Sequence, residues 1–314
     1  MGEFELIARH FTRPVRRADL GVGDDCALLR VAPGQQLAVS SDLLVEGRHF
    51  LSTVAPERLG HKALAVNLSD LAACGAEPLA FTLALALPRA DDAFLAGFAR
   101  GLFALAEQHG IELVGGDTTA GPLAVCITVM GQVPPGQALL RSGAKPGDQL
   151  WVSGPLGDAR LALEVFRGSV ALPGSGFDTV RRAMELPQPR VALGLALRGI
   201  ATSAIDLSDG LLGDLGHVLA QSRAGAEVLA DAIPRSAVLA TMPRPLQIEC
   251  TLAGGDDYEL LFTAPPTRHA EVQALAAGAA CIGRITAEPG LRVLDAQGQP
   301  IATPWRGFDH FASP

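Results

Sequence analysis

The sequence predicts a two-domain α/β protein, because apolar strand-like stretches alternate with amphipathic helical stretches along the chain. Its 314 residues suggest two domains of ordinary size. A stretch dense in proline and glycine lies near residues 137–150 and is the best candidate for the boundary. We therefore expect an N-terminal sheet domain over residues 1–137 and a C-terminal α/β domain over residues 138–314.

Three helices and four strands are expected in the first domain. Pro56 is a favourable first residue of a helix, and Gly75 and Gly110 are typical stop signals. The predicted helices cover residues 4–12, 56–75 and 91–110. The predicted strands, which are short apolar runs, cover residues 35–44, 78–88, 111–116 and 123–133.

The second domain shows the same alternation of strands and helices. Strands are predicted at residues 149–154, 201–205, 258–265, 279–287 and 291–295. Helices are predicted at residues 158–166, in the stretch that ends near residue 223, and at residues 267–278. An acidic turn at residues 206–210 separates a predicted strand from the second of these helices.

Composition excludes several classes of function. A formal net charge of −8 argues against nucleic acid as a main partner, although divalent cations would allow an acidic protein to bind phosphates. The five cysteines lack the spacing of a zinc site and are typical of a reducing compartment. No signal peptide and no apolar run long enough to cross a bilayer is evident, so we expect a cytoplasmic protein without a membrane partner.

Acidic residues recur beside apolar stretches throughout the chain. A single aspartate beside glycine is most often a turn former or a helix cap. However, Asn67 and Asp70 lie three apart in an apolar helical stretch and so share a face. A buried carboxylate needs a cation, and basic residues are sparse here. We therefore expect one shared metal site among the acidic turns that hold these aspartates: Asp24, Asp25, Asp42, Asp70, Asp117, Asp206, Asp209, Asp256 and Asp257.

The neighbouring side chains indicate which metal is bound. Hard oxygen donors without nearby cysteine or histidine pairs favour Mg²⁺ or Mn²⁺, and the hydroxyl donors here are Ser40, Ser41, Thr118 and Ser208. The glycine pairs at 115–116 and 254–255 permit close approach to a bulky anion. Phosphate together with Mg²⁺ indicates nucleotide chemistry, although the Walker pattern, the protein-kinase signatures and a complete dinucleotide fingerprint are absent.

With these motifs in place, the chain resembles the thiamine-monophosphate kinase family of the aminoimidazole-ribonucleotide-synthetase-like superfamily. The resemblance runs from end to end and is specific when its motifs are taken together. The matching stretches are GEFELIARHF, GVGDDCALL, SSDLLVEGRHF, HKALAVNLSDLAACGAEP, GGDTT, RSGAKPGD, AIDLSDGL, GGDDYELLF and GFDHF.

The resemblance implies ATP-dependent phosphorylation of thiamine monophosphate by direct in-line attack, without a phosphoenzyme. Several Mg²⁺ ions would be bound by Asp25, Ser40, Ser41, Asp42, Asp70, Asp117, Asp206 and Asp209. Some relatives carry threonine in place of Ser41, where either the hydroxyl or the backbone carbonyl can serve. ATP would contact Gly116, Asp117, Arg141 and Ser208, and thiamine monophosphate would contact His49, Asp257 and Phe308.

The resemblance also implies a homodimer, in which the N-terminal domains pair through their sheets. The first domain would then bind ATP and Mg²⁺ and dimerise, and the second would complete the nucleotide and substrate site. The unusually apolar stretches at residues 80–87 and 123–133 are compatible with this arrangement. They are equally compatible with central strands in the sheet of a monomer.

Three different functions remain open from the sequence. The first is that of a sister synthetase in the same superfamily, which would make aminoimidazole ribonucleotide or selenophosphate. No cysteine precedes Cys26, whereas selenophosphate synthesis would be suggested by a reactive N-terminal cysteine or selenocysteine. The second is that of a nucleotide sensor that binds without catalysis, and the third is that of a metal-dependent phosphatase.

The stretch ATPWRGFDHF, residues 302–311, contains three aromatic residues in a protein with only 5% aromatic residues. Trp305, Phe308 and Phe311 would either pack on the core or form a pocket for a flat cationic ring. The resemblance favours Phe308 as the stacking residue, with Trp305 as the next candidate.

Overall fold

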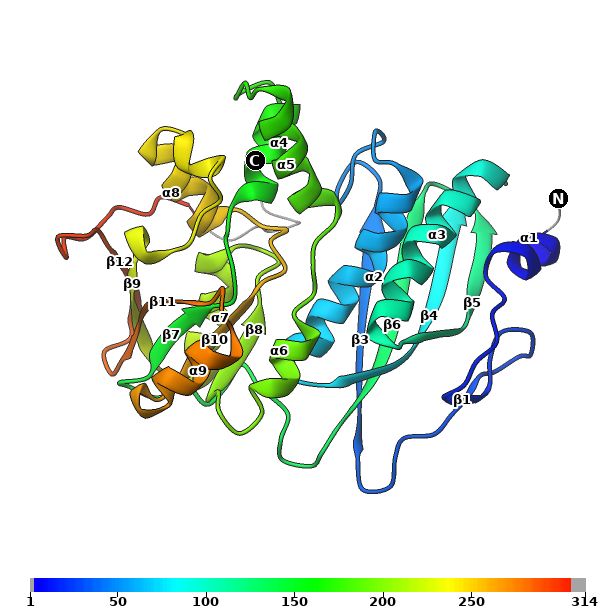
Figure 1. Ribbon diagram of the computed structural model, residues 1–314, viewed down its shortest axis with the longest axis horizontal. Coiled ribbons are helices and arrows are strands. Elements are labelled where there is room, and N and C mark those ends of the chain that lie inside the picture. Colours follow the sequence, from blue (N-terminus) through cyan, green and yellow to red (C-terminus); the bar gives the residue numbers. More distant parts are fainter. Residues whose placement is uncertain (1–2, 306–314) are drawn as a thin grey trace. The chain divides into compact units, whose positions relative to one another are not determined.

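The protein has a two-domain α/β fold, and a computed structural model describes its residues 3–305 (Figure 1). The first compact unit extends to Leu71 and continues from Ala76 to Ala138. The second unit contains Ala72–Gly75 and the chain from Leu139 onward. Within the described residues, no helix combines the length and the apolar character needed to cross a bilayer.

The first unit contains a four-stranded sheet in the order β3-β6-β4-β5. A separate hairpin, β1 and β2, precedes it, and helix α1 lies near the N-terminus. The elements of this unit are α1 (Glu3–His10), β1 (Ala18–Leu20), β2 (Leu28–Leu29), β3 (Gln36–Val45), α2 (Pro56–Ala73), β4 (Glu77–Leu87), α3 (Asp92–His109), β5 (Glu112–Ala120) and β6 (Ala124–Val133). The helices and strands predicted for this half of the chain are all present.

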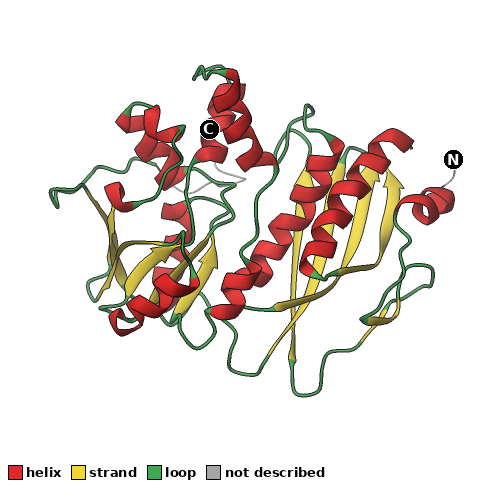
Figure 2. Ribbon diagram, viewed as in Figure 1, coloured by secondary structure: helices red, strands yellow, loops and turns green. Residues whose placement is uncertain are grey.

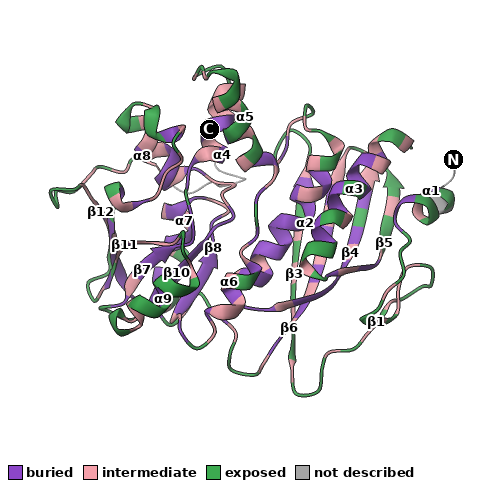
Figure 3. Ribbon diagram, in the orientation of Figure 1, coloured by how far each residue is buried: buried purple, intermediate pink, exposed green. Residues whose placement is uncertain are grey.

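Helices α2 and α3 lie side by side on one face of this sheet (Figure 2). Asp91 caps α3 by accepting a hydrogen bond from the backbone nitrogen of Phe94 at 3.1 Å, and Gly110 ends the helix in the left-handed conformation with φ 61°. Most residues of β4 and every second residue of β6 are buried, whereas in β3 exposed residues alternate with half-buried ones (Figure 3). The sheet therefore presents to α2 and α3 a face different from the one that carries the exposed residues of β3.

The second unit contains a six-stranded sheet in the order β12-β9-β11-β7-β10-β8. Its strands are β7 (Gln149–Val152), β8 (Ser203–Asp206), β9 (Gly225–Leu229), β10 (Leu260–Ala264), β11 (Ala280–Thr286) and β12 (Gly290–Leu294). Its longer helices are α4 (Asp158–Phe166), α5 (Gly174–Glu185), α6 (Val191–Ala196), α7 (Leu211–Ser222), α8 (Arg244–Ala253) and α9 (His269–Leu275).

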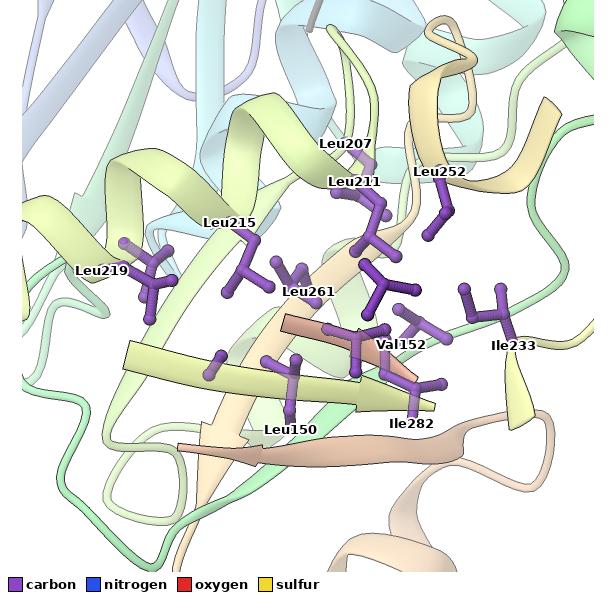
Figure 4. Packing of buried hydrophobic residues seen from close by; sticks show 14 of the residues in the cluster. Leu150, Val152, Leu207, Leu211, Leu215, Leu219, Ile233, Leu252, Leu261 and Ile282 are labelled. Atoms are coloured by element: carbon purple, nitrogen blue, oxygen red, sulfur yellow. The ribbon is translucent and has the colours of Figure 1, made fainter. Parts of the chain in front are cut away.

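The core of the second unit forms where α7 packs on the sheet. Leu211, Leu215 and Leu219 recur every four residues, so they form one apolar stripe on α7 (Figure 4). That stripe meets side chains from β7, β10 and β11, including Leu150, Leu261 and Ile282. This packing fixes the start of α7 and therefore the acidic turn that precedes it.

Among the α-helices and strands of the second unit, four were not predicted from the sequence: α5, α6, β9 and α8. Part of the reason is that α4, α5 and α8 contribute to a small apolar cluster of their own, which includes Leu161, Val180 and Cys250. The missed helices have 6 to 12 residues, and isolated helices this short depend on tertiary packing for their stability.

Among the strands that the structure describes, most pairs are antiparallel, and only β4–β5 and β9–β12 are parallel. The aspartates of the expected metal site lie at different positions relative to their strands. Asp42 and Asp117 lie within β3 and β5 rather than in the turns that follow these strands. Asp206, in contrast, is the last residue of β8.

Candidate functional site

Two hydrogen bonds join β3 to α2 through candidate site residues. Ser40 Oγ donates to Asp70 Oδ2 at 2.5 Å, and the backbone nitrogen of Asp42 donates to Asn67 Oδ1 at 3.1 Å. Asn67 is buried, and its Nδ2 donates to the carbonyl of Ala63 at 3.0 Å. Asn67 and Asp70 therefore share a helix face, as their spacing predicts, and that face meets β3.

The side chain of Ser41 is directed differently from that of Ser40. Its hydroxyl oxygen lies 2.9 Å from Thr128 Oγ1 and donates to the carbonyl of Ile127 at 3.2 Å, both on the neighbouring strand β6. Successive strand residues point to opposite faces of a sheet, so Ser40 and Asp42 face α2 while Ser41 does not. The Ser41 hydroxyl is therefore separated from this group, and only its backbone carbonyl could join Ser40 and Asp42 as a ligand.

Gly116 and Asp117 lie on β5, at the opposite edge of the sheet from β3. Strands β6 and β4 lie between them, so about 14 Å of sheet separates Asp117 from Asp42 at the usual strand spacing. One copy of the sheet therefore does not bring these two aspartates together. Gly116 also has a structural requirement, because its φ is +147° and a Cβ there would lie 1.8 Å from the carbonyl oxygen of Leu83.

Asp25 and His49 lie in loops of the first unit. Asp25 is exposed, and its backbone nitrogen donates to Asp24 Oδ1 at 2.8 Å. His49 Nδ1 accepts a hydrogen bond from the backbone nitrogen of Val45 at 3.0 Å. In the neutral imidazole the proton is therefore on Nε2, which can donate to an anion. Buried Lys62 donates from Nζ to the carbonyl of His49 at 3.1 Å and so helps to hold this loop.

In the second unit, Asp206, Ser208 and Asp209 lie within four residues of one another. Asp206 is buried and pairs with Leu260 on β10, whereas Ser208 and Asp209 are half-buried in the turn before α7. The backbone nitrogens of Ser208 and Asp209 both donate to Asp214 Oδ2, each at 3.1 Å. Asp214 was not predicted as a site residue, although an acid five residues after Asp209 was visible in the sequence.

Burial raises the pKa of the Asp214 carboxyl to about 7, and the negative charge of Asp209 contributes to the increase. The guanidinium of Arg141 acts in the opposite direction and lowers this pKa, so its charge lies within electrostatic reach of the turn. Arg141 itself is exposed. The charge of Arg141 therefore acts on the same carboxyl, Asp214, that accepts hydrogen bonds from Ser208 and Asp209.

The two acidic turns of the second unit are hydrogen-bonded to each other. The backbone nitrogen of Asp256 donates to the carbonyl of Ser208 at 2.9 Å, and that of Tyr258 donates to the carbonyl of Leu207 at 2.8 Å. At Gly255 a Cβ would lie 2.5 Å from the Ser208 carbonyl oxygen. Close contact between the two turns therefore accounts for this glycine without an anion.

Both carboxylate oxygens of Asp257 accept a hydrogen bond from the backbone nitrogen of Gly157, which precedes α4. The distances are 2.9 Å to Oδ1 and 3.1 Å to Oδ2. Burial, together with the charges of Glu259, Asp158 and Asp256, raises the pKa of Asp257 well above its usual value. Glu259, in contrast to Asp257, is paired with a cation: it accepts hydrogen bonds from the guanidinium of Arg190 and from the hydroxyl of Ser153. The surroundings of Asp257 are therefore electronegative and suit a cationic ligand.

Among residues 3–305 no group of three or more histidine, cysteine, aspartate or glutamate side chains is arranged to hold a metal ion. Mg²⁺ commonly takes one or two protein carboxylates and completes its shell with phosphates and water. Asp70 accepts a hydrogen bond from Ser40, and Asp206 and Asp209 lie within four residues of one another, so each pair has residue types of that kind. These residues fit Mg²⁺ that is bound together with a phosphorylated ligand, rather than a closed protein cage.

The predicted aromatic pocket is described only in part. Trp305 packs against the main apolar core of the second unit. Phe308 and Phe311 lie outside the described residues.

Comparison with known proteins identifies the family. The family model "AIR synthase related protein, N-terminal domain" matches residues 23–133, and the corresponding C-terminal domain matches residues 145–296. Thiamine-monophosphate kinase from Escherichia coli K12 is 45% identical over 323 residues, which covers 100% of this chain and 99% of that protein.

Two solved structures extend the comparison. Thiamine-monophosphate kinase from Stenotrophomonas maltophilia K279a has a TM-score of 0.85 and 44% identity, covering 95% of this chain and 96% of that one. AaThiL complexed with AMPPCP and TMP has a TM-score of 0.80 and 30% identity, covering 92% of each chain. The chain belongs to the AIR synthase related family and, within it, to the thiamine-monophosphate kinases.

Proposed function

We propose that this protein transfers the γ-phosphoryl group of ATP to the phosphate of thiamine monophosphate, giving thiamine diphosphate and ADP. The observation that carries the proposal is full-length identity of 45% to a thiamine-monophosphate kinase. Further support comes from the similarity to AaThiL, whose structure contains both AMPPCP and TMP. In the reaction a phosphate oxygen of thiamine monophosphate bonds to the γ-phosphorus as the bond to the β–γ bridging oxygen breaks.

The residues need no general base for this step, because the attacking phosphate oxygen is already ionised. Their task is to position two phosphorylated molecules and to offset the negative charge that gathers between them. Bound Mg²⁺ would supply charge neutralisation. The residues proposed to hold it are Asp25, Ser40, Asp42, Asp70, Asp117, Asp206 and Asp209, with Ser41 through its carbonyl.

The remaining predicted residues have substrate-binding roles in this proposal. Ser208 lies beside Asp209 in the turn before α7, and the charge of Arg141 acts on Asp214, which holds that turn. Arg141 and Ser208 are therefore suited to bind the nucleotide together with Gly116 and Asp117. His49 Nε2 is suited to donate to the phosphate of thiamine monophosphate. The electronegative surroundings of Asp257 suit the cationic thiazolium ring, with Phe308 as the proposed stacking residue.

The active protein is proposed to be a homodimer, joined through the N-terminal sheet. Three large apolar residues on one side of β3 are about half exposed: Leu37 at 50%, Val39 at 58% and Leu43 at 54%. A second copy would cover them. If β3 of one copy approached β5 of the other, Asp117 of the second copy would meet Asp42, which a single copy of the sheet keeps apart.

The domain roles follow from this arrangement. The N-terminal domain, residues 1–137, would dimerise and bind ATP and Mg²⁺, and residues 138–314 would complete the nucleotide and substrate site. A cytoplasmic location is part of the proposal and is supported by the five cysteines, none of which forms a disulfide within the described residues.

An ADP-release assay tests the proposed reaction. The purified protein is incubated with Mg-ATP and, in separate reactions, with thiamine monophosphate, aminoimidazole-ribonucleotide precursors or selenide. We expect ADP and thiamine diphosphate in equal amounts with thiamine monophosphate alone. Release of phosphate without an acceptor would indicate a phosphatase, and binding of ATP without turnover would indicate a sensor. Either outcome would overturn the proposal.

A further inference from the structure

Asp214 holds the turn that carries two of the proposed site residues. Its side chain is only 3% exposed, and a single carboxylate oxygen accepts from the backbone nitrogens of Ser208 and Asp209. Asp214 is therefore placed behind the turn, in contact with its backbone rather than with solvent.

This contact is not an ordinary helix cap. The residue at the cap position of α7 is Gly210, which makes no side-chain cap hydrogen bond. Asp214 lies four residues further along and reaches back past Gly210 to the two residues before it. In a capping box the acid at the third helical position reaches only as far as the cap residue. The Asp214 carboxylate therefore acts on the turn itself.

The same turn is held from its other side. The backbone nitrogen of Asp256 donates to the Ser208 carbonyl at 2.9 Å, so Ser208 is hydrogen-bonded through both its backbone nitrogen and its carbonyl oxygen. Asp214 thus supplies one half of a backbone clamp, and the GGDDY turn supplies the other. This fixed backbone limits the directions that the Ser208 and Asp209 side chains can take.

We propose that Asp214 is a positioning residue, which orients Ser208 and Asp209 for a metal–nucleotide complex through these two hydrogen bonds. The inference rests on the proposed function, which gives Asp209 to Mg²⁺ and Ser208 to ATP. Mutation of residues that orient metal ligands typically lowers metal affinity or activity by about 10- to 100-fold.

Two substitutions separate hydrogen bonding from charge. Asp214→Asn removes the charge but retains an oxygen that can accept both hydrogen bonds, whereas Asp214→Ala removes the acceptor. Asp148 provides a matched control in the same unit. It is also buried, at 5% exposed, and accepts from the backbone nitrogen of Lys145 at 2.9 Å and the hydroxyl of Thr202 at 2.6 Å. Asp148→Ala therefore removes a comparable buried acceptor elsewhere.

The readout is binding of Mn²⁺ in the presence of AMPPCP, followed by electron paramagnetic resonance, with the melting temperature recorded for each variant. Asp214→Ala is expected to weaken Mn²⁺ binding by about 10- to 100-fold. Asp214→Asn should stay within about threefold of wild type, because only the charge assistance of the hydrogen bonds is lost. Asp148→Ala should lower the melting temperature and bind Mn²⁺ as wild type does.

Two results would overturn the inference. One is wild-type Mn²⁺ affinity in Asp214→Ala, and the other is equal weakening in the asparagine and alanine variants. If Asp214→Ala does not fold, the comparison of Asp214→Asn with wild type still decides between hydrogen bonding and charge. The assay uses no thiamine monophosphate, so a failure of the proposed reaction would appear separately, as normal Mn²⁺–AMPPCP binding without turnover.

Discussion

Ser40 on β3 and Asp70 on α2 are joined by a hydrogen bond of 2.5 Å between the serine hydroxyl and the aspartate carboxylate. Thirty residues separate them in the chain, and the contact brings two predicted metal ligands from different elements together. Asp42, on the same side of β3 as Ser40, is anchored to the same helix through Asn67. This group of residues is the most completely assembled part of the candidate site in the first unit.

Asp70→Asn is expected to reduce turnover at limiting Mg²⁺ by at least about 100-fold, or about 2.7 kcal/mol of transition-state stabilisation. The amide has nearly the same size but lacks the charge that binds a cation. The measurement is ADP release across a Mg²⁺ titration, with circular dichroism to confirm that the fold is intact. Asp178→Asn, which removes the same charge from a site on α5 outside the proposed metal ligands, is the control and should behave as wild type. Near-normal turnover in Asp70→Asn would exclude a metal-binding role.

Val39→Lys is expected to convert the protein from a dimer to a monomer, because it places a charge in the exposed apolar row of β3. Light scattering should give about 65 kDa for wild type, twice the 32.5 kDa of one chain, and about half of that for the variant. Leu275→Lys changes an exposed leucine on α9 and should leave the dimer intact. A wild-type mass near that of one chain at micromolar concentration would contradict the dimer.

The metal-free protein is expected to lose stability as the pH rises toward and through 7. The pKa of Asp214 is about 7 in the folded protein, against an ordinary value of 3.8, so the folded state retains a proton that the unfolded chain releases at lower pH. The stabilising contribution is therefore complete below about pH 4 and is lost as the pH rises through 7. A difference of about three pKa units corresponds to roughly 4 kcal/mol at most.

Urea unfolding in EDTA at pH 5 and pH 8 measures this dependence. Asp214→Asn cannot titrate, so its stability should change less between the two pH values and should exceed that of wild type at pH 8. The raised pKa of Asp257 acts in the same direction but is present in both proteins. Parallel pH profiles for the two proteins would show that Asp214 titrates normally.

Phe308→Ala is expected to raise KM for thiamine monophosphate by up to about 30-fold and to leave KM for ATP unchanged. The physical reason is loss of a ring face that attracts the cationic thiazolium. Trp305→Ala is the informative comparison, because Trp305 packs against the core and its loss should lower the melting temperature instead. If Phe308→Ala weakened both substrates equally, or lowered only the melting temperature, Phe308 would be a packing residue.

Local periodicity in the sequence was sufficient to predict β3 and α2, the two elements that carry Ser40, Asp42 and Asp70. The pattern of residues 56–75 predicted a helix, and a spacing of three places Asn67 and Asp70 on one face of any helix. Strand alternation likewise separates Ser41 from Ser40 and Asp42, a distinction that the sequence contained but that the prediction of one shared cluster did not use. These relationships depend only on backbone geometry within one element, so the sequence by itself determined them.

The tertiary structure alone decided which elements became neighbours. Asp117 and Asp42 lie at opposite edges of the first sheet because its strand order, β3-β6-β4-β5, differs from the order of the strands in the chain. The hydrogen bonds from Ser208 and Asp209 to Asp214 require the bend before α7, which packing of the Leu211–Leu219 stripe on the sheet holds in place. Strand order and turn geometry result from many long-range contacts acting together, and no local sequence pattern encodes that sum.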